Sequence, residues 1–165
     1  MANIHYLEGD ATQPIGNGVK IVAHVCNNIG AWGAGFVLAV SKRWPIAKSC
    51  YLRIKNKELG FMQLVHVGDE IFVANMIAQN NINDSKSGWL GDLIDYDALV
   101  ICLDSVFSYA QDIGATVHMP RIGCGLAGSS WDKIEPLLIH VVQKYNVDCY
   151  VYDLGVKKWT SAIQI

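Results

Sequence analysis

The stretch VKIVAHVCNNIGAWGAG, residues 19–35, joins an apolar segment to a loop with three glycines. Residues 19–26 are apolar almost throughout, which is typical of a central strand covered on both faces. The glycine loop at 30–35 leads into helical spacing over 33–44, and Pro45 separates this segment from a second helical one at 47–54. A buried strand that passes through a glycine loop into a helix indicates an α/β domain.

Strand-like and helical segments alternate along the rest of the chain. Apolar residues at steps of three and four predict a helix over 99–110, and Ser129 with Asp132 predicts a capped start for the last helix. The polar turn at 68–70 predicts a hairpin between the strands that flank it. The predicted strands are 4–7, 19–26, 64–67, 71–78, 116–119 and 149–152. This order predicts a three-layer α/β/α fold with a mixed, mostly parallel central sheet.

The length of 165 residues fits one domain with a substantial core. We expect this domain to occupy residues 1–155 and to be followed by a short tail at 156–165. The segment 79–91 is too polar to pack and too long for a simple turn, so we predict a mobile surface loop there.

Composition narrows the classes of partner. The 13 basic and 15 acidic residues give a net charge of -2 and form no basic stripe, so stable DNA binding and an anionic membrane surface are not expected. The five cysteines are odd in number and lack a CxxC pair, which predicts free thiols and neither a disulfide framework nor a metal site. The chain begins without a secretory signal and has no membrane-length apolar run, so a cytoplasmic protein is predicted. We also expect the protein to need no cofactor.

A second glycine loop, GCGLAG at 123–128, follows the strand predicted at 116–119. Glycines let the backbone approach a ligand closely, and successive N–H groups followed by a helix N-terminus form a good anion site. Neither glycine loop contains a basic residue. Two such loops in equivalent places therefore predict a site for a diphosphate held by backbone amides.

Two alternatives remain for these loops. The glycines could serve only as tight turns. The second loop also satisfies GxGxxG, and Asp148 lies 20 residues beyond Gly128, as in a dinucleotide-binding fold. That motif normally belongs to the first βαβ unit of a longer sheet, whereas here little chain follows it, so a nicotinamide-dependent enzyme is the weaker interpretation.

Four segments resemble the macro domain family, in the branch that contains the yeast-type ADP-ribose 1''-phosphate phosphatase and the terminal ADP-ribose protein glycohydrolase. They are Gly9-Asp10, Ala23-His24-Val25-Cys26-Asn27 with the loop at 30–35, Pro120-Arg121-Ile122-Gly123-Cys124-Gly125-Leu126, and Val151-Tyr152-Asp153. The resemblance implies a macro-domain-like fold and a ligand that is ADP-ribose or ADP-ribose 1''-phosphate, free or attached to a protein or nucleic acid.

The resemblance also implies a role for each matching residue. Asp10 and Ala11 would bind adenine, with Tyr152 and Asp153 at the border of its pocket, and Asn27 would bind the distal ribose. The two loops would enclose the phosphates through Gly33, Ala34, Gly35 and Phe36 on one side and Ile122, Gly123, Cys124, Gly125 and Leu126 on the other. A turn cap is the alternative for Asp10, and a core position is the alternative for Tyr152.

His24 and Asn27 are the candidate catalytic residues. A histidine occupies the His24 position in the phosphatase branch, which suggests a general acid or nucleophile, and the alternative is a satisfied core histidine. Strand alternation points the two side chains to opposite faces, so a joint role requires a bend. Cys124 lacks an apparent base, and its backbone N–H is its expected contribution.

The chain departs from the glycohydrolase pattern at two places. Ala127 stands where an aspartate is expected, and Met76, Ile77 and Ala78 fill the region of the expected lysine. A lysine-linked intermediate is therefore not supported. Hydrolysis of the 1''-phosphate or of an ADP-ribosyl ester by an oriented water is still consistent with the residues, as is a non-catalytic ADP-ribose-binding module.

Overall fold

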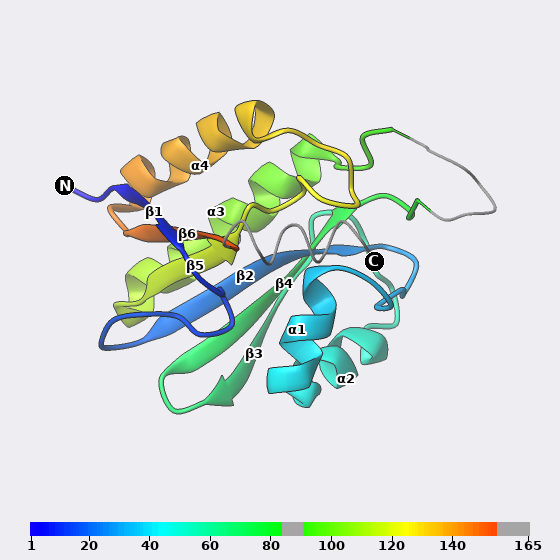
Figure 1. Cartoon of the computed structure of the whole chain (residues 1–165), viewed down its shortest axis with the longest axis horizontal. Coiled ribbons are helices and arrows are strands. Elements are labelled where there is room, and N and C mark those ends of the chain that lie inside the picture. Colours follow the sequence, from blue (N-terminus) through cyan, green and yellow to red (C-terminus); the bar gives the residue numbers. More distant parts are fainter. Residues whose placement is uncertain (84–90, 155–165) are drawn as a thin grey trace.

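The computed structural model describes residues 1–83 and 91–154. Within them six strands form one sheet in the order β1-β6-β5-β2-β4-β3 (Figure 1). Every neighbouring pair is parallel except β3 with β4, which is the predicted hairpin. The strands are β1 Ile4–Glu8, β2 Lys20–Asn27, β3 Met62–Gly68, β4 Ile71–Gln79, β5 Thr116–Pro120 and β6 Cys149–Asp153. The predicted mixed, mostly parallel sheet is confirmed.

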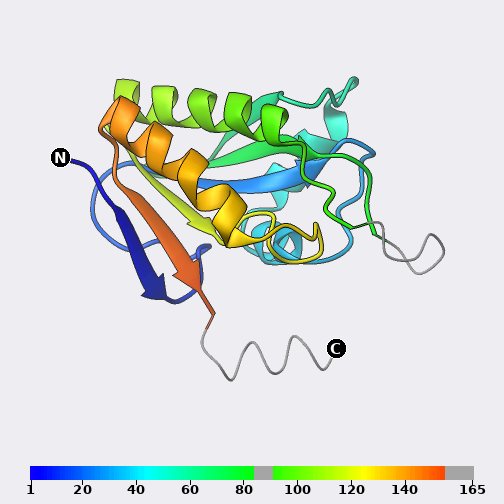
Figure 2. The same cartoon turned by 90° about the horizontal axis from the view of Figure 1, so that it is seen from above.

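Helices cover both faces of the sheet, which confirms the three layers. The helices α1 (Phe36–Arg43) and α2 (Pro45–Arg53) pack on one face, where Val22 and Cys26 of β2 join their core. The helices α3 (Tyr96–Ile113) and α4 (Trp131–Tyr145) pack on the other, against Ile21 and Ala23. Figure 2 shows α3 and α4 on one side of the sheet. The strand β2 is therefore apolar because it is buried from both sides.

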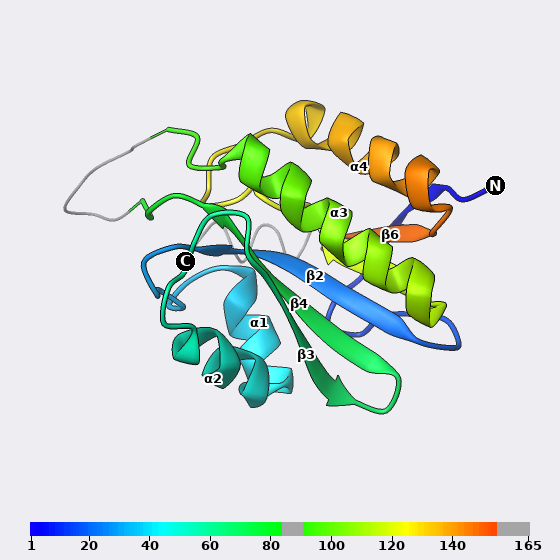
Figure 3. The same cartoon turned by 180° about the vertical axis from the view of Figure 1, so that it is seen from behind.

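The parallel strands place their carboxyl ends along one edge of the sheet. Figure 3 shows β2 and β4 running together beneath α3, with α1 and α2 beyond them. Both glycine loops begin at this edge, since one follows β2 and the other follows β5. The GxGxxG pattern thus follows the fifth strand along the chain, β5, and does not follow the first. This position counts against the dinucleotide-binding interpretation.

Two helix starts differ from the predictions. The first helix begins at Phe36 and not at Gly33, because Gly35 takes φ +83°, outside the helical region. The predicted cap at Ser129 is wrong: Ser130 precedes α4 and makes no side-chain cap bond. The hydroxyl of Ser129 instead contacts the Tyr96 hydroxyl at 2.7 Å, so tertiary contact overrides the local signal.

Parts of two predicted segments lie outside the described residues. These are 84–90 of the surface loop and 155–165, which include the tail, so the domain limits stay a prediction. Gln79, placed in the loop by the sequence analysis, is the last residue of β4. Among the described helices, none has the length and apolar character needed to cross a bilayer.

Two histidines lie deep in the fold. His118 of β5 bonds to the Tyr152 hydroxyl at 2.7 Å and to the Thr116 hydroxyl at 2.8 Å, and His24 of β2 bonds to Asn75 at 2.6 Å. Burial lowers the pKa of each imidazole to about 4, and the charge of Lys20 adds to the effect on His118. Both rings are therefore neutral in the folded protein at pH 7.

We expect the free energy of unfolding to fall as the pH drops from 6.5 to 4. The unfolded chain takes up protons near the ordinary histidine pKa of 6.5, whereas the folded chain takes them up only near 4. The loss should reach at most about 3 kcal/mol for each histidine. Urea unfolding at pH 7.5, 6.0 and 4.5 measures it.

The matched variants are His118→Gln and, as a control, His66→Gln, which changes an exposed histidine of β3. The first should flatten the dependence on pH and the second should leave it as in the unaltered protein. Equal slopes in all three proteins would contradict the assignment to buried histidines.

Candidate ligand-binding site

The two glycine loops flank one pocket at the carboxyl edge of the sheet. A methyl group placed on Gly35 would lie 3.6 Å from Cδ1 of Leu126, so the loops are in contact range. The cavity has a volume of about 260 Å³. Its lining is Val25, Cys26 and Asn27 of β2, Ala31, Gly33 and Ala34 of the first loop, Val37 of α1, Gln79 at the end of β4, Ile82 and Asn83 after it, and Leu126 of the second loop.

Several loop amides are available to a ligand. Within the described residues, the N–H groups of Gly33, Ala34, Gly125 and Leu126 have no protein acceptor. The N-terminus of α1 lies directly after the first loop and adds its positive dipole end. The amides and the helix together can stabilise an anion without a cationic side chain in either loop.

The amide of Cys124, which was predicted to bind the ligand, is engaged in a turn of the protein, so its role at the site stays a prediction. This N–H donates to the carbonyl of Arg121 at 3.3 Å, because the chain turns tightly into the second loop. The thiol donates to the carbonyl of Ile122 at 3.5 Å, and burial raises its pKa above the ordinary value. Cys124 therefore lacks the low pKa of a reactive thiol.

Asn27 shapes the first loop. The pairing of β2 with β4 shifts its register between Cys26 and Asn27, which supplies the bend that a joint role with His24 required. The side-chain oxygen of Asn27 accepts bonds from the amides of Ile29 and Ala31 and from the Tyr51 hydroxyl at 2.9–3.1 Å. Asn27 thus holds the loop in place while it lines the pocket.

His24 lies on the α1/α2 side of the sheet, outside the pocket lining. Its side chain is buried, and Nε2 donates to Oδ1 of Asn75. The ring also meets the edge of Trp32, with centroids 5.4 Å apart. This placement favours the alternative of a satisfied core histidine. Trp32 is 6% exposed and packs in the same core.

The residues expected around adenine lie at the ends of β1 and β6. Asp10 caps a turn, because its Oδ1 accepts bonds from the amide and hydroxyl of Thr12 at 2.9 and 2.7 Å. Tyr152 is 4% exposed and its hydroxyl accepts a bond from the amide of Ile15. Asp153 forms an ion pair with Arg121. The predicted turn-cap and core alternatives are thus observed, while the ligand roles of these residues stay predictions.

These residues and the pocket share one edge of the sheet. Neighbouring strands lie about 4.8 Å apart, so about 14 Å separates the end of β1 from the end of β2. The second loop, after β5, lies between them in the strand order. An elongated ligand could therefore extend from Asp10, past the second loop, to the pocket beside Asn27.

The sequence analysis missed two groups of site residues. Gln79, Ile82 and Asn83 line the pocket, although the segment was predicted as a mobile loop. Arg121 lies two residues before the second loop. No role was predicted for it, because only residues within the two loops were considered as possible cationic ligands. The PRIGCGL segment at 120–126, in which an arginine stands just before the glycines, could have indicated that Arg121 belongs to the site.

Comparisons with known proteins agree with this fold. A macrodomain protein from Streptomyces coelicolor is 39% identical, with a TM-score of 0.79 over 93% of this chain and 100% of that one. An ADP-ribose 1''-phosphate phosphatase from Meyerozyma guilliermondii is 25% identical over 92% of this chain and 99% of its own length. The fold also matches a Trypanosoma brucei macrodomain in complex with ADP-ribose, at 13% identity and a TM-score of 0.66 over 98% and 68% of the two chains. No protein-family model matches the chain.

We expect Gly123→Ala to destabilise the second loop. Gly123 has φ +74°, and an added Cβ would lie 2.9 Å from Cδ1 of Ile134 and 3.0 Å from Cγ1 of Ile94. Backbone strain and overpacking should together lower the free energy of unfolding by about 1–3 kcal/mol. Urea unfolding monitored by fluorescence measures the change.

Gly125→Ala is the matched control in the same loop. An added Cβ at Gly125 meets no atom within 4 Å. Its effect should therefore stay within about 0.5 kcal/mol. If the two variants are equally stable, the close packing inferred beneath Gly123 is absent in solution.

Proposed function

Because this chain belongs to the macrodomain family, we propose that it binds ADP-ribose derivatives along the carboxyl edge of its sheet and hydrolyses them at the distal ribose. The yeast relatives that carry the name ADP-ribose 1''-phosphate phosphatase support the choice of substrate. The Trypanosoma brucei macrodomain in complex with ADP-ribose supports the choice of ligand through its shared fold.

The observation that carries the proposal is the convergence of two amide-lined loops on one pocket. Gly33 and Ala34, whose amides are unpaired among the described residues, line the same cavity as Leu126 of the second loop. A diphosphate has two anionic groups and offers one to each loop. A single phosphate would leave one loop without an anion, so a diphosphate is the better match.

The strand order sets the direction of the ligand. We place the adenine at the end of β1, where Oδ2 of Asp10 has no partner among the described residues and could accept the adenine amino group. The diphosphate would then lie between the loops and the distal ribose in the pocket. There Asn27 and Gln79 supply amide groups for the ribose hydroxyls.

The described pocket lining contains no carboxylate, imidazole or amine. Its polar side chains are the amides of Asn27, Gln79 and Asn83 and the thiol of Cys26, whose pKa burial raises far above the ordinary value. Hydrolysis would therefore depend on a water molecule oriented by the loops and the bound diphosphate. Water attack on a 1''-phosphate would release inorganic phosphate, and attack on an ADP-ribosyl ester would release the acid.

The same lining favours a second function, a non-catalytic module for ADP-ribose. A pocket without a general acid or base can hold the distal ribose as well as react at it. In that case the partner would be free ADP-ribose or an ADP-ribosylated protein or nucleic acid. Binding and turnover must therefore be measured separately.

We expect ADP-ribose to stabilise the folded protein. At a hundred times its dissociation constant, ADP-ribose should raise the free energy of unfolding by about 2.7 kcal/mol. ADP should bind more weakly because it lacks the distal ribose, and adenosine should bind weakest because it lacks the diphosphate. Calorimetric titration and thermal unfolding measure this order, and stabilisation by NAD without stabilisation by ADP-ribose would contradict it.

We expect slow release of phosphate from ADP-ribose 1''-phosphate, detected colorimetrically. Ala34→Glu should abolish binding and turnover together, because it places a carboxylate in the first loop beside the diphosphate. His24→Gln should retain most of the turnover, since His24 lies outside the pocket lining.

A different result would contradict each of these expectations. Loss of turnover in folded His24→Gln at unchanged ADP-ribose affinity would restore His24 as the catalytic residue. Binding without any turnover in the unaltered protein would identify a binding module.

A further inference from the structure

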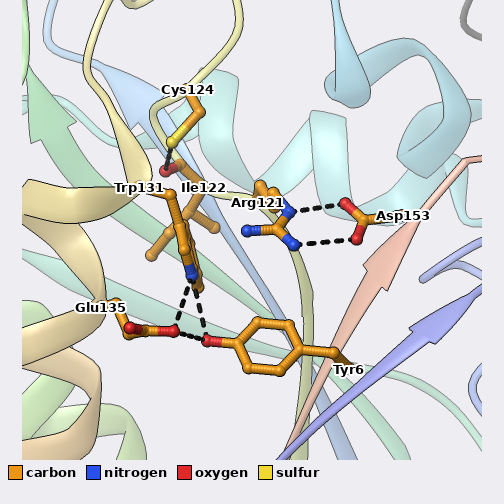
Figure 4. Close-up of polar contacts among 7 residues, drawn as sticks. All are labelled: Tyr6, Arg121, Ile122, Cys124, Trp131, Glu135 and Asp153. Atoms are coloured by element: carbon orange, nitrogen blue, oxygen red, sulfur yellow. Dashed lines mark hydrogen bonds and ion pairs between the residues drawn. The ribbon is translucent and has the colours of Figure 1, made fainter.

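The side chain of Arg121 lies beside the second loop, among Asp153, Tyr6 and Trp131 (Figure 4). We call this group of residues the box around Arg121. The Nε of Arg121 donates to Oδ1 of Asp153 at 2.6 Å and its Nη2 donates to Oδ2 at 3.0 Å, a bidentate pair. The guanidinium carbon also lies 5.2 Å from the ring centroid of Tyr6 and 5.2 Å from that of Trp131. Residues of two strands, β1 and β6, and of the helix α4 thus meet at this side chain, which follows the end of β5.

The aromatic walls of the box are themselves held by hydrogen bonds. The indole Nε1 of Trp131 donates to the Tyr6 hydroxyl at 3.0 Å and to Glu135 at 3.2 Å, and the Tyr6 hydroxyl also bonds to Glu135. Glu135 lies one turn along α4 from Trp131, so the helix fixes both walls. The position of the guanidinium is therefore set before any ligand binds.

The backbone of Arg121 lies two residues before the second loop and bonds to it. Its carbonyl accepts the Cys124 amide, and later bonds close the loop from Gly128 to the Gly125 carbonyl and from Ser129 to the Gly123 carbonyl. These bonds leave the amides of Gly125 and Leu126 unpaired among the described residues. The conformation of the second loop thus depends on where Arg121, which precedes it, is held.

We propose that Arg121 is a positioning residue of the diphosphate site: its pairing with Asp153 between Tyr6 and Trp131 fixes the second loop so that its free amides face the ligand. The inference rests on the proposed function for the identity of the ligand. Because Asp153 neutralises the guanidinium, the contribution of Arg121 is geometric and adds little net charge at the site.

The geometry requires an arginine. A guanidinium is planar, so it can bond to both carboxylate oxygens of Asp153 while its central carbon lies within cation–π distance of both the Tyr6 and the Trp131 ring, which are nearly perpendicular to each other. A lysine keeps the positive charge but offers a point charge without the fork or the flat faces. Arg121→Lys therefore separates positioning from simple attraction of an anion.

We expect Arg121→Lys and Arg121→Met to lose about tenfold in affinity for ADP-ribose, as for a broken charge-assisted pair. Adenosine affinity, measured by displacement, should stay unchanged because adenosine has no diphosphate. Lys144→Met is the matched control, since it removes an ion pair of similar type with Asp104, far from the loop along α4. Its affinity for both ligands should equal that of the unaltered protein.

A second readout needs no ligand. Hydrogen exchange of the bonded Cys124, Gly128 and Ser129 amides should be about tenfold faster in Arg121→Lys than in the unaltered protein or Lys144→Met. Unchanged exchange and ADP-ribose affinity in Arg121→Lys would overturn the proposal, as would equal losses for ADP-ribose and adenosine. If the unaltered protein fails to bind ADP-ribose while Arg121→Lys still accelerates exchange, the proposed function fails and the positioning of the loop is upheld.

Discussion

Parallel pairing of β2 with both β5 and β4 is the constraint on which the site depends. It sends the chain out of β2 and β5 at the same edge, so two loops that are far apart in the sequence become neighbours. At their contact Gly35 lies close to Leu126, and its φ of +83° is a backbone conformation that favours glycine. The proposed phosphate site of backbone amides depends on this topology, because each loop passes towards the N-terminus of a helix.

Backbone amides give this site a different electrostatic character from one built on lysines. The chain has a net charge of -2, and the guanidinium beside the second loop is already paired with Asp153. Fixed N–H dipoles must then stabilise the anion, and they do so only when they are correctly oriented before binding. The bonds of Asn27 in the first loop and the box around Arg121 in the second supply that orientation.

The elements that the sequence predicted well are those with a local signal. The apolar run of β2, the helical spacing of α3 and the glycines of both loops each depend on neighbouring residues alone. The predicted cap at Ser129 is wrong because the hydroxyl of Ser129 bonds to Tyr96, 33 residues away in the sequence. Gln79 and Asn83 were missed for a similar reason, since only the sheet brings them beside Leu126.

The histidine in β2 shows how a residue that resembles a catalyst can serve the fold. His24 donates to Asn75, and Asn75 in turn donates to the carbonyl of Ala47 and to Gln63, which ties β2, β4 and β3 to α2. A buried polar network of this kind stabilises one arrangement only if every member is bonded, because an unpaired member would carry the full cost of desolvation. The position of α2 then fixes Tyr51, whose hydroxyl bonds to Asn27 at the pocket. His24 therefore serves the packing of β2, β3 and β4 against α2, and burial of its imidazole is part of that role.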